Sequence, residues 1–142
     1  MEFLTRNAIE TEGVGKELAK LLDSRGIKRA FIAMRGEMGV GKTAFTRGFA
    51  EYFGISGVKS PTYTIVNEYR GNVSIFHFDM YRIESEDDLY SIGFDDYIER
   101  DGYSIAEWSE NVQEFLPIDA IYVTISRTDS SEDERIIKIE FN

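Results

Sequence analysis

The chain has 142 residues, enough for one domain with its own core, and it contains no cysteine, which excludes disulfide bonds and thiolate metal centres. Sixteen basic residues against 26 acidic ones give a formal charge of −10. Nucleic-acid binding draws on clustered lysine and arginine, so this surface would on average repel RNA, and we expect any role in an RNA pathway to run through protein partners.

The chain also gives no sign of a membrane or secretory location. It contains no run of about 18 apolar residues, so we expect no membrane-spanning segment. Residues 1–6 lack the basic segment and the long apolar stretch of a signal peptide. We therefore expect a cytoplasmic protein.

The first part of the chain predicts a helix, a strand and a second helix. Apolar side chains in residues 11–22 follow helical spacing, and Thr11 is predicted as the N-cap. Residues 30–34 form a short, continuously apolar run, which is typical of a strand buried on both faces. Aromatic side chains in residues 45–53 follow helical spacing again, and Gly54 is suited to end that helix.

The second part of the chain predicts mainly strands. Residues 63–70 and 73–79 flank Gly71 and Asn72, which favours a hairpin. The remaining predicted elements are a short helix opened by acidic residues 84–88, a second helix over 94–100, and strands over 103–106, 120–126 and 135–141. Strands and helices intermix, so the predicted fold class is α/β with an antiparallel portion.

The stretch GEMGVGKT at residues 36–43 matches the pattern G-x-x-x-x-G-K-[ST] in full. Glycines allow successive backbone N–H groups to converge on phosphate oxygens. Lys42 is expected to reach the β- and γ-phosphates, and the Thr43 hydroxyl is expected to bind Mg²⁺. The predicted cofactor-binding residues of this P-loop are Glu37, Met38, Gly39, Val40, Gly41, Lys42 and Thr43.

The surroundings of the P-loop strengthen this prediction. A buried strand precedes it and an amphipathic helix follows it, so the positive end of the helix dipole would face the same anion. We therefore predict a single P-loop NTPase-like domain over residues 1–142, with a mixed parallel and antiparallel central sheet flanked by helices. The chain lacks the N-K-x-D segment with which GTPases read guanine, so ATP is the expected ligand.

A P-loop also needs an acidic residue at the end of a neighbouring strand to hold or position Mg²⁺. Two segments compete for this role: the strand over 73–78 leads into Asp79, and the strand over 103–106 leads into Glu107. Either carboxylate could instead be an ordinary solvated strand end. Composition does not choose between them.

Two further features lie near the predicted site. Ser60, Thr62 and Thr64 follow the P-loop helix where P-loop hydrolases carry a switch segment that reads the γ-phosphate, although a plain polar loop has the same composition. His77 is the sole histidine. Alternation places it on the strand face opposite Phe76 and Phe78, either as a packed residue or near the phosphates with Asp79.

With these segments in place, the sequence resembles the TsaE family, the small ATPases of bacterial tRNA threonylcarbamoyladenosine (t6A) synthesis. The resemblance covers nearly the whole chain. It is carried by GEMGVGKT at 36–43, TRGF at 46–49, VKSPTYTIVNEY at 58–69, HFDMYRI at 77–83, IGFDDY at 92–97, EWSE at 107–110 and LP at 116–117. The segment over 127–135 gains least from the comparison.

The resemblance implies roles for particular residues. Glu107 would join Thr43 at Mg²⁺, and Asp79 would lie on the γ-phosphate side. Lys42 would act in catalysis with Asp79 and with Thr62 and Thr64 of the switch segment. Thr11 would lie near the nucleotide. Trp108, which directly follows Glu107, is expected beside the nucleotide, with core packing as the alternative.

The resemblance also implies a Mg²⁺-dependent ATPase whose hydrolysis resets a larger complex. Its partners would be the TsaD and TsaB proteins, which transfer threonylcarbamoyl to adenosine 37 of tRNA, so that contact with tRNA is indirect. Two other interpretations stay open: a small-molecule kinase, or a nucleotide-binding regulatory module without turnover. A kinase would usually carry an arginine-bearing lid, and Arg82, Arg100, Arg127 and Arg135 are scattered along the sequence.

Overall fold

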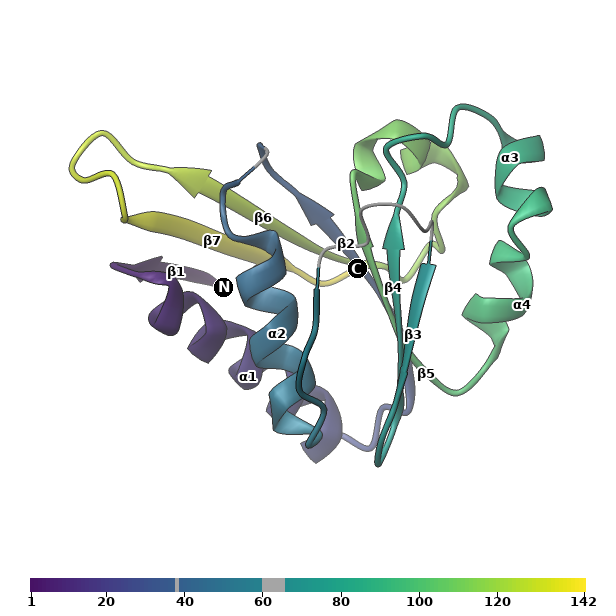
Figure 1. The fold of residues 1–142 in the computed structure, drawn as a ribbon, viewed down its shortest axis with the longest axis horizontal. Helices are drawn as coiled ribbons and strands as arrows, with labels where there is room; N and C mark the ends of the chain where they lie inside the picture. Colours follow the sequence, from purple (N-terminus) through teal and green to yellow (C-terminus); the bar gives the residue numbers. More distant parts are fainter. Residues whose placement is uncertain (38, 60–65) are drawn as a thin grey trace.

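A twisted seven-stranded sheet forms the centre of the molecule (Figure 1) in the computed structural model, which describes residues 1–37, 39–59 and 66–142. Within these residues the strand order is β1-β7-β6-β2-β5-β4-β3. The strands are β1 (Glu2–Thr5), β2 (Arg29–Arg35), β3 (Val66–Arg70), β4 (Ser74–Asp79), β5 (Gly102–Glu107), β6 (Ile121–Arg127) and β7 (Arg135–Glu140).

The pairing directions confirm the predicted mixed sheet. Strand β2 runs parallel to both β5 and β6, and β4 runs parallel to β5, so these four strands form a parallel centre. The pairs β1–β7, β6–β7 and β3–β4 are antiparallel and lie towards the two edges. All six residues of β5 are buried, as expected for a parallel strand covered on both faces.

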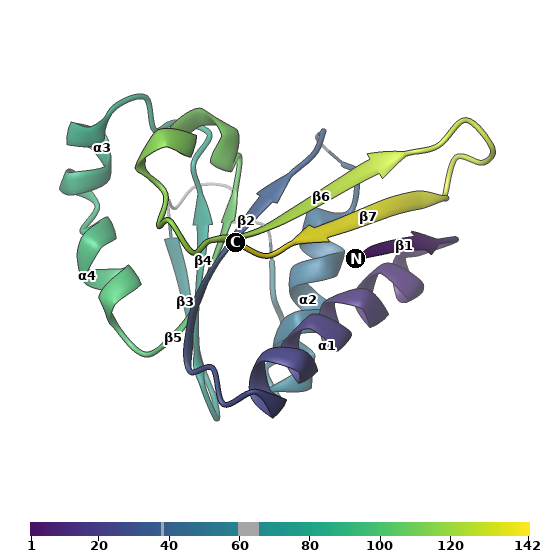
Figure 2. The ribbon, with the colours of Figure 1, turned by 180° about the vertical axis from the view of Figure 1, so that it is seen from behind.

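Helices cover both faces of this sheet (Figures 1 and 2). Helices α1 (Ala8–Ser24) and α2 (Lys42–Tyr52) lie together on one face, while α3 (Glu86–Ser91) and α4 (Phe94–Glu99) lie on the other. The 3-10 helix η1 (Ser109–Phe115) packs with α3 and α4. Side chains of β2 alternate between the two faces of the sheet. Ile32 and Met34 pack in the core under α1 and α2, whereas Phe31 and Ala33 pack in the core on the opposite face.

Helices α1 and α2 approach each other closely through two glycines. A Cβ atom added at Gly48 would lie 1.9 Å from the Glu12 carbonyl oxygen, and one added at Gly15 would lie 2.1 Å from the Phe45 carbonyl oxygen. Hydrogen atoms are therefore all that these two contact points accommodate. The close contact fixes α2, and with it the loop that precedes α2.

The predicted position of Thr11 at the start of a helix is wrong. Helix α1 begins at Ala8, and the side chain of Asn7 caps it by accepting a hydrogen bond from the Glu10 backbone N–H at 2.9 Å. Residues 8–10 are exposed, so the apolar spacing that marks the helix begins one turn after the helix itself. Thr11 lies inside the helix, where its hydroxyl meets that of Thr5 at 2.9 Å.

The other predicted elements are confirmed, with small differences at their ends. The hairpin around Gly71 and Asn72 joins β3 to β4, although residues 63–65 of the predicted first strand lie outside the described residues. Strand β1 and helix η1 were not expected from the sequence pattern. None of the helices in the described part of the chain has the length and apolar character needed to cross a membrane.

Candidate phosphate-binding site

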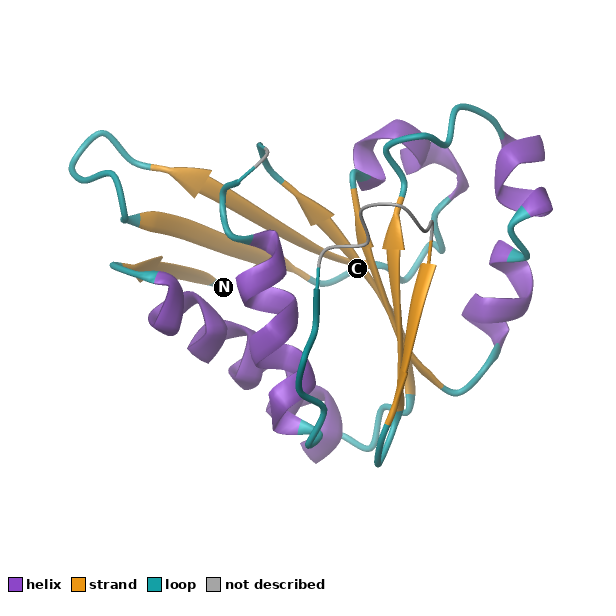
Figure 3. Ribbon diagram, in the orientation of Figure 1, coloured by secondary structure: helices purple, strands orange, loops and turns teal. Residues whose placement is uncertain are grey.

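The P-loop lies at the carboxyl ends of the parallel strands, between the end of β2 and the start of α2 (Figure 3). Met38 lies outside the described residues. Gly36 and Gly41 have φ angles of 146° and 120°, values that residues with a side chain rarely adopt. A Cβ atom at Gly36 would also lie 2.6 Å from the Ile125 carbonyl oxygen. Both glycines are therefore needed for the path of this loop.

Helix α2 starts without a side-chain cap. Gly41 occupies the N-cap position and makes no side-chain hydrogen bond to the first turn. The backbone N–H groups of a first helical turn have no partner within the helix, and together with the helix dipole they favour an anion at this point. Lys42 is the first residue of α2, and Thr43 is the second.

Lys42 is a buried cation in an unusual setting, since its relative exposure is only 4%. Its Nζ donates a hydrogen bond to the Gly36 carbonyl oxygen at 2.8 Å and lies 4.3 Å from the centre of the Trp108 ring. Among the residues that the structure describes, no carboxylate forms an ion pair with it. A buried charge is costly unless it is paired, and the described residues give the Lys42 ammonium a carbonyl oxygen and an aromatic ring but no carboxylate.

The two competing carboxylates, Asp79 and Glu107, lie side by side at the carboxyl ends of their strands. Asp79 ends β4, Glu107 ends β5, and the two residues are paired in the parallel register. Glu107 is buried, and its Oε2 lies 2.6 Å from Nε2 of His77, which is fully buried. The Asp79 carboxylate accepts a hydrogen bond from the Tyr81 backbone N–H at 2.9 Å. The predicted strand face of His77 is confirmed. Phe76 and Phe78 pack in the core beside α3 and α4, whereas Ile75, two residues from His77, packs in the core under α1 and α2.

Trp108 turns sharply out of β5 into η1. Its φ of 59° is the one positive value outside glycine among the described residues. The Ser109 hydroxyl anchors the turn by donating to the Met34 carbonyl oxygen of β2 at 2.9 Å. The indole consequently faces Lys42 on one side and the Tyr81 ring, 5.1 Å away, on another. Trp108 thus packs against the apolar core and also contacts the P-loop lysine.

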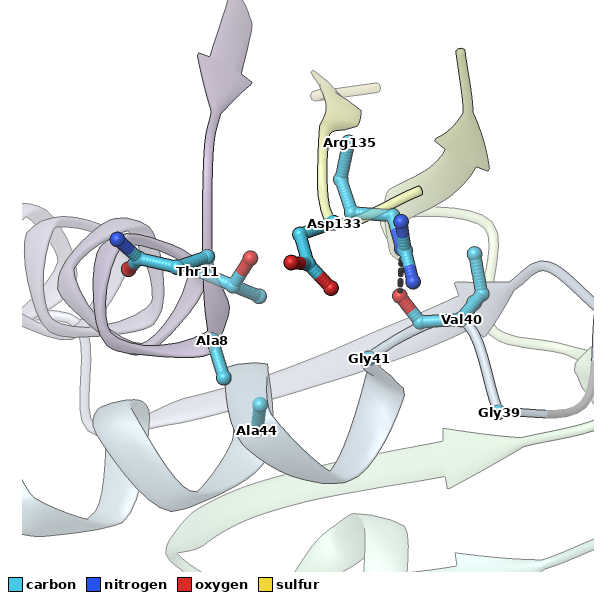
Figure 4. Close-up of a pocket in the computed structure, with 9 residues that line it drawn as sticks. Ala8, Thr11, Gly39, Val40, Gly41, Ala44, Asp133 and Arg135 are labelled. Carbon is cyan, nitrogen blue, oxygen red and sulfur yellow. Dashed lines mark hydrogen bonds between the residues drawn. The ribbon is translucent and has the colours of Figure 1, made fainter. Parts of the chain in front are cut away.

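A pocket of about 340 Å³ opens beside the P-loop (Figure 4). It is lined by Asn7, Ala8, Thr11, Gly39, Val40, Gly41, Ala44, Asp133 and Arg135. Thr11 therefore lines this pocket, and its hydroxyl lies 2.9 Å from that of Thr5. We call this hollow the side pocket.

Two of the four arginines considered for a kinase lid, Arg127 and Arg135, both contact the P-loop, although they are not neighbours in the sequence. Arg135 donates from Nε to the Val40 carbonyl oxygen at 2.8 Å, as Figure 4 shows. Arg127 pairs with the Glu37 carboxylate at 3.1 Å and lies 3.4 Å from the Gly39 carbonyl oxygen. These two arginines converge at the loop. Arg100 instead pairs with Glu68 on β3.

The contact of Arg135 has a consequence for the direction of a neighbouring amide. In a trans peptide the C=O and N–H groups point in opposite directions, so fixing the Val40 carbonyl also fixes the Gly41 N–H away from Arg135. We expect Arg135→Gln to weaken nucleotide binding by about 1 kcal/mol, roughly fivefold in Kd, because one hydrogen bond that orients the loop is lost.

Isothermal titration calorimetry measures this effect. Arg25→Gln is the matched control, because Arg25 is exposed at the far end of α1. Equal affinities for the Arg135→Gln variant and the control would contradict a role for Arg135 in shaping the loop.

The sheet, the glycine loop after its central strand and the helix that follows define a P-loop NTPase-like protein. The family model for "Threonylcarbamoyl adenosine biosynthesis protein TsaE" matches residues 5–137, and the chain belongs to this family. The predicted resemblance is thereby confirmed.

Relatives and a solved structure agree with this assignment. The tRNA threonylcarbamoyladenosine biosynthesis protein TsaE of Bacillus subtilis is 35% identical over 139 residues, 96% of this chain and 83% of that protein. The protein of the same name from Haemophilus influenzae is 38% identical over 126 residues, 87% and 80% of the two chains. The crystal structure of Bacillus subtilis YdiB superposes with a TM-score of 0.78 at 30% identity, covering 98% of this chain and 83% of that one.

Proposed function

We propose that this chain binds and hydrolyses ATP and that it thereby supports the complex that forms t6A at position 37 of tRNA. The observation that carries the proposal is Lys42, a cation that is 4% exposed, at the start of α2, without a carboxylate partner in the described part of the chain. A triphosphate would supply the missing negative charge. The glycine-rich backbone and the uncapped start of α2 would supply N–H groups to the same phosphates.

The residues at the sheet edge fit Mg²⁺, which prefers oxygen ligands and usually keeps several waters beside one or two carboxylates. Thr43 and Glu107 would hold the ion, which neutralises charge on the phosphates when it is bound. Lys42 would leave the Gly36 carbonyl and bind phosphate. Asp79 would lie towards the γ-phosphate. Thr62 and Thr64, which with Ser60 lie outside the described residues, would act as the switch segment.

The nucleoside would occupy the side pocket next to the P-loop. Thr11 and Ala8 of α1 and Gly39 to Gly41 of the loop would contact it, and Trp108 would cover the phosphate side next to Lys42. The absence of an N-K-x-D segment from the sequence favours adenine over guanine. The family relatives are named for tRNA threonylcarbamoyladenosine biosynthesis, which supports placing the ATPase in that pathway.

The proposed partners are TsaD and TsaB, in the cytoplasm. The formal charge of −10 supports indirect rather than direct contact with tRNA, because an acidic surface repels the phosphate backbone. We expect slow ATP turnover by the isolated chain and stimulation by the TsaD–TsaB pair. Partner completion of a P-loop site can raise rates by about 10³- to 10⁵-fold, and here we expect the low end or less.

Phosphate release with and without the TsaD–TsaB pair tests the proposal, together with affinity for that pair in the presence of ADP and of a non-hydrolysable ATP analogue. We expect tighter association with the analogue, because the γ-phosphate orders a switch segment. Equal affinities together with unstimulated turnover would contradict the proposal. Phosphate transfer to an added small-molecule acceptor would instead favour a kinase.

The two carboxylates at the sheet edge should differ in phenotype. We expect Glu107→Ala to weaken Mg²⁺-dependent nucleotide binding, because it removes a proposed metal ligand. Asp79→Ala is expected to leave binding nearly unchanged and to reduce turnover, because its role would arise at the γ-phosphate. Titration of Mg²⁺ against each variant separates them: a raised Mg²⁺ requirement for Asp79→Ala alone would reverse the assignment.

A further inference from the structure

The hydrogen bond between His77 and Glu107 joins two buried side chains from neighbouring parallel strands. Nε2 of His77 lies 2.6 Å from Oε2 of Glu107, with relative exposures of 0% for His77 and 8% for Glu107. An ionised carboxylate is an acceptor only, so Nε2 donates the proton of this bond. Charge-assisted hydrogen bonds of this kind are short and strong, so this one restricts the carboxylate that it binds.

The opposite side of the imidazole ring makes no compensating contact. Nδ1 of His77 is buried and has no hydrogen-bond partner among the residues that the structure describes. A buried polar atom left unpaired costs free energy. If packing alone determined this position, an apolar side chain would fill it without that cost. The feature that distinguishes His77 from an apolar residue is its bond to Glu107.

We propose that His77 is a positioning residue for the metal site: it holds Oε2 of Glu107, so that the other carboxylate oxygen would be available to a metal ion. This inference rests on the proposed role of Glu107 as a Mg²⁺ ligand. A Glu side chain has three rotatable bonds, and here its orientation is fixed from β4, the neighbouring strand in the sheet. Partners that orient metal ligands in this way typically contribute about 10- to 100-fold to metal affinity.

Two amide substitutions separate positioning from packing. In His77→Gln the amide nitrogen is as many bonds from Cβ as Nε2 of histidine, so it reaches Oε2 of Glu107. In His77→Asn the amide nitrogen corresponds to Nδ1 and falls short. Both variants bury a polar amide of similar character, which makes them a matched pair.

The measurement is the Mg²⁺ concentration that gives half-maximal binding of a non-hydrolysable ATP analogue, determined by calorimetry at graded Mg²⁺. We expect His77→Asn to need about 10- to 100-fold more Mg²⁺ than the wild type. His77→Gln is expected to remain close to the wild type. Binding of the analogue without Mg²⁺ should be equal in all three proteins.

Equal Mg²⁺ requirements in His77→Asn and the wild type would overturn the inference, as would a His77→Gln variant that is folded but as impaired as His77→Asn. Thermal unfolding without ligand checks the fold of each variant. If His77→Asn does not fold, His77→Leu replaces it, because leucine restores apolar volume without a donor. A wild-type protein whose binding does not depend on Mg²⁺ would instead contradict the metal assignment in the proposed function.

Discussion

Lys42→Ala is expected to lower the affinity for ATP by roughly 10- to 150-fold, because a hydrogen bond to a charged group contributes about 1.5–3 kcal/mol. In the free protein Nζ of Lys42 donates to the Gly36 carbonyl and lies over the Trp108 ring, and no carboxylate of the described residues pairs with it. Bound phosphate would provide the charge partner that this lysine lacks. The fold should survive the substitution, because no ion pair of the described residues is broken.

A second substitution, Lys42→Met, separates the loss of the charge from the loss of the apolar part of the side chain. Lys42→Met keeps the apolar stem and removes the charge, so it should leave the melting temperature of the free protein unchanged or raise it. The same variant should lose the stabilisation that added ATP gives the wild type. Thermal unfolding with and without nucleotide measures both effects. A folded Lys42→Met variant that ATP stabilises as much as the wild type would contradict the P-loop assignment.

Gly48→Ala is expected to destabilise the fold by about 3 kcal/mol or more, at or above the usual range for overpacking. The new Cβ atom would lie 1.9 Å from the Glu12 carbonyl oxygen and 2.6 Å from its Cα, and both are backbone atoms of α1. The two helices would have to separate, which would also shift the start of α2.

Gly13→Ala is the matched control for this prediction. Gly13 lies in α1, and an added Cβ atom would meet nothing within 4 Å. Alanine there should stabilise the protein by about 0.5–1 kcal/mol, since glycine is the poorer helix former. Urea unfolding curves give both values. Equal stabilities for the two variants would contradict the close contact of α1 with α2.

Features carried by neighbouring residues could be predicted from the sequence. The P-loop is an example, because its glycines, Lys42 and Thr43 are contiguous and its flanking strand and helix have clear periodicities. The N-terminus of α1 could not be placed, because residues 8–10 face solvent and show no apolar spacing. Strand β1 has four residues at the edge of the sheet, too few for an alternation to stand out.

Features that depend on which strands become neighbours could not be predicted. Asp79 and Glu107 were each expected at a strand end, but their pairing follows from β4 and β5 lying side by side. The contact of His77 with Glu107 depends on the same register. Arg127 and Arg135 reach the P-loop because β6 lies next to β2 and β7 next to β6 in the sheet. Sequence spacing alone carries no signal for such long-range contacts.

A crystal structure of this chain with Mg²⁺ and a non-hydrolysable ATP analogue would show whether the P-loop binds the triphosphate. The prediction is that Nζ of Lys42 leaves the Gly36 carbonyl and bonds to the β- and γ-phosphates, with the metal ion held by Thr43 and Glu107. The nucleoside is expected in the side pocket next to Thr11. A nucleotide bound elsewhere, with Lys42 still 2.8 Å from the Gly36 carbonyl oxygen, would contradict the account.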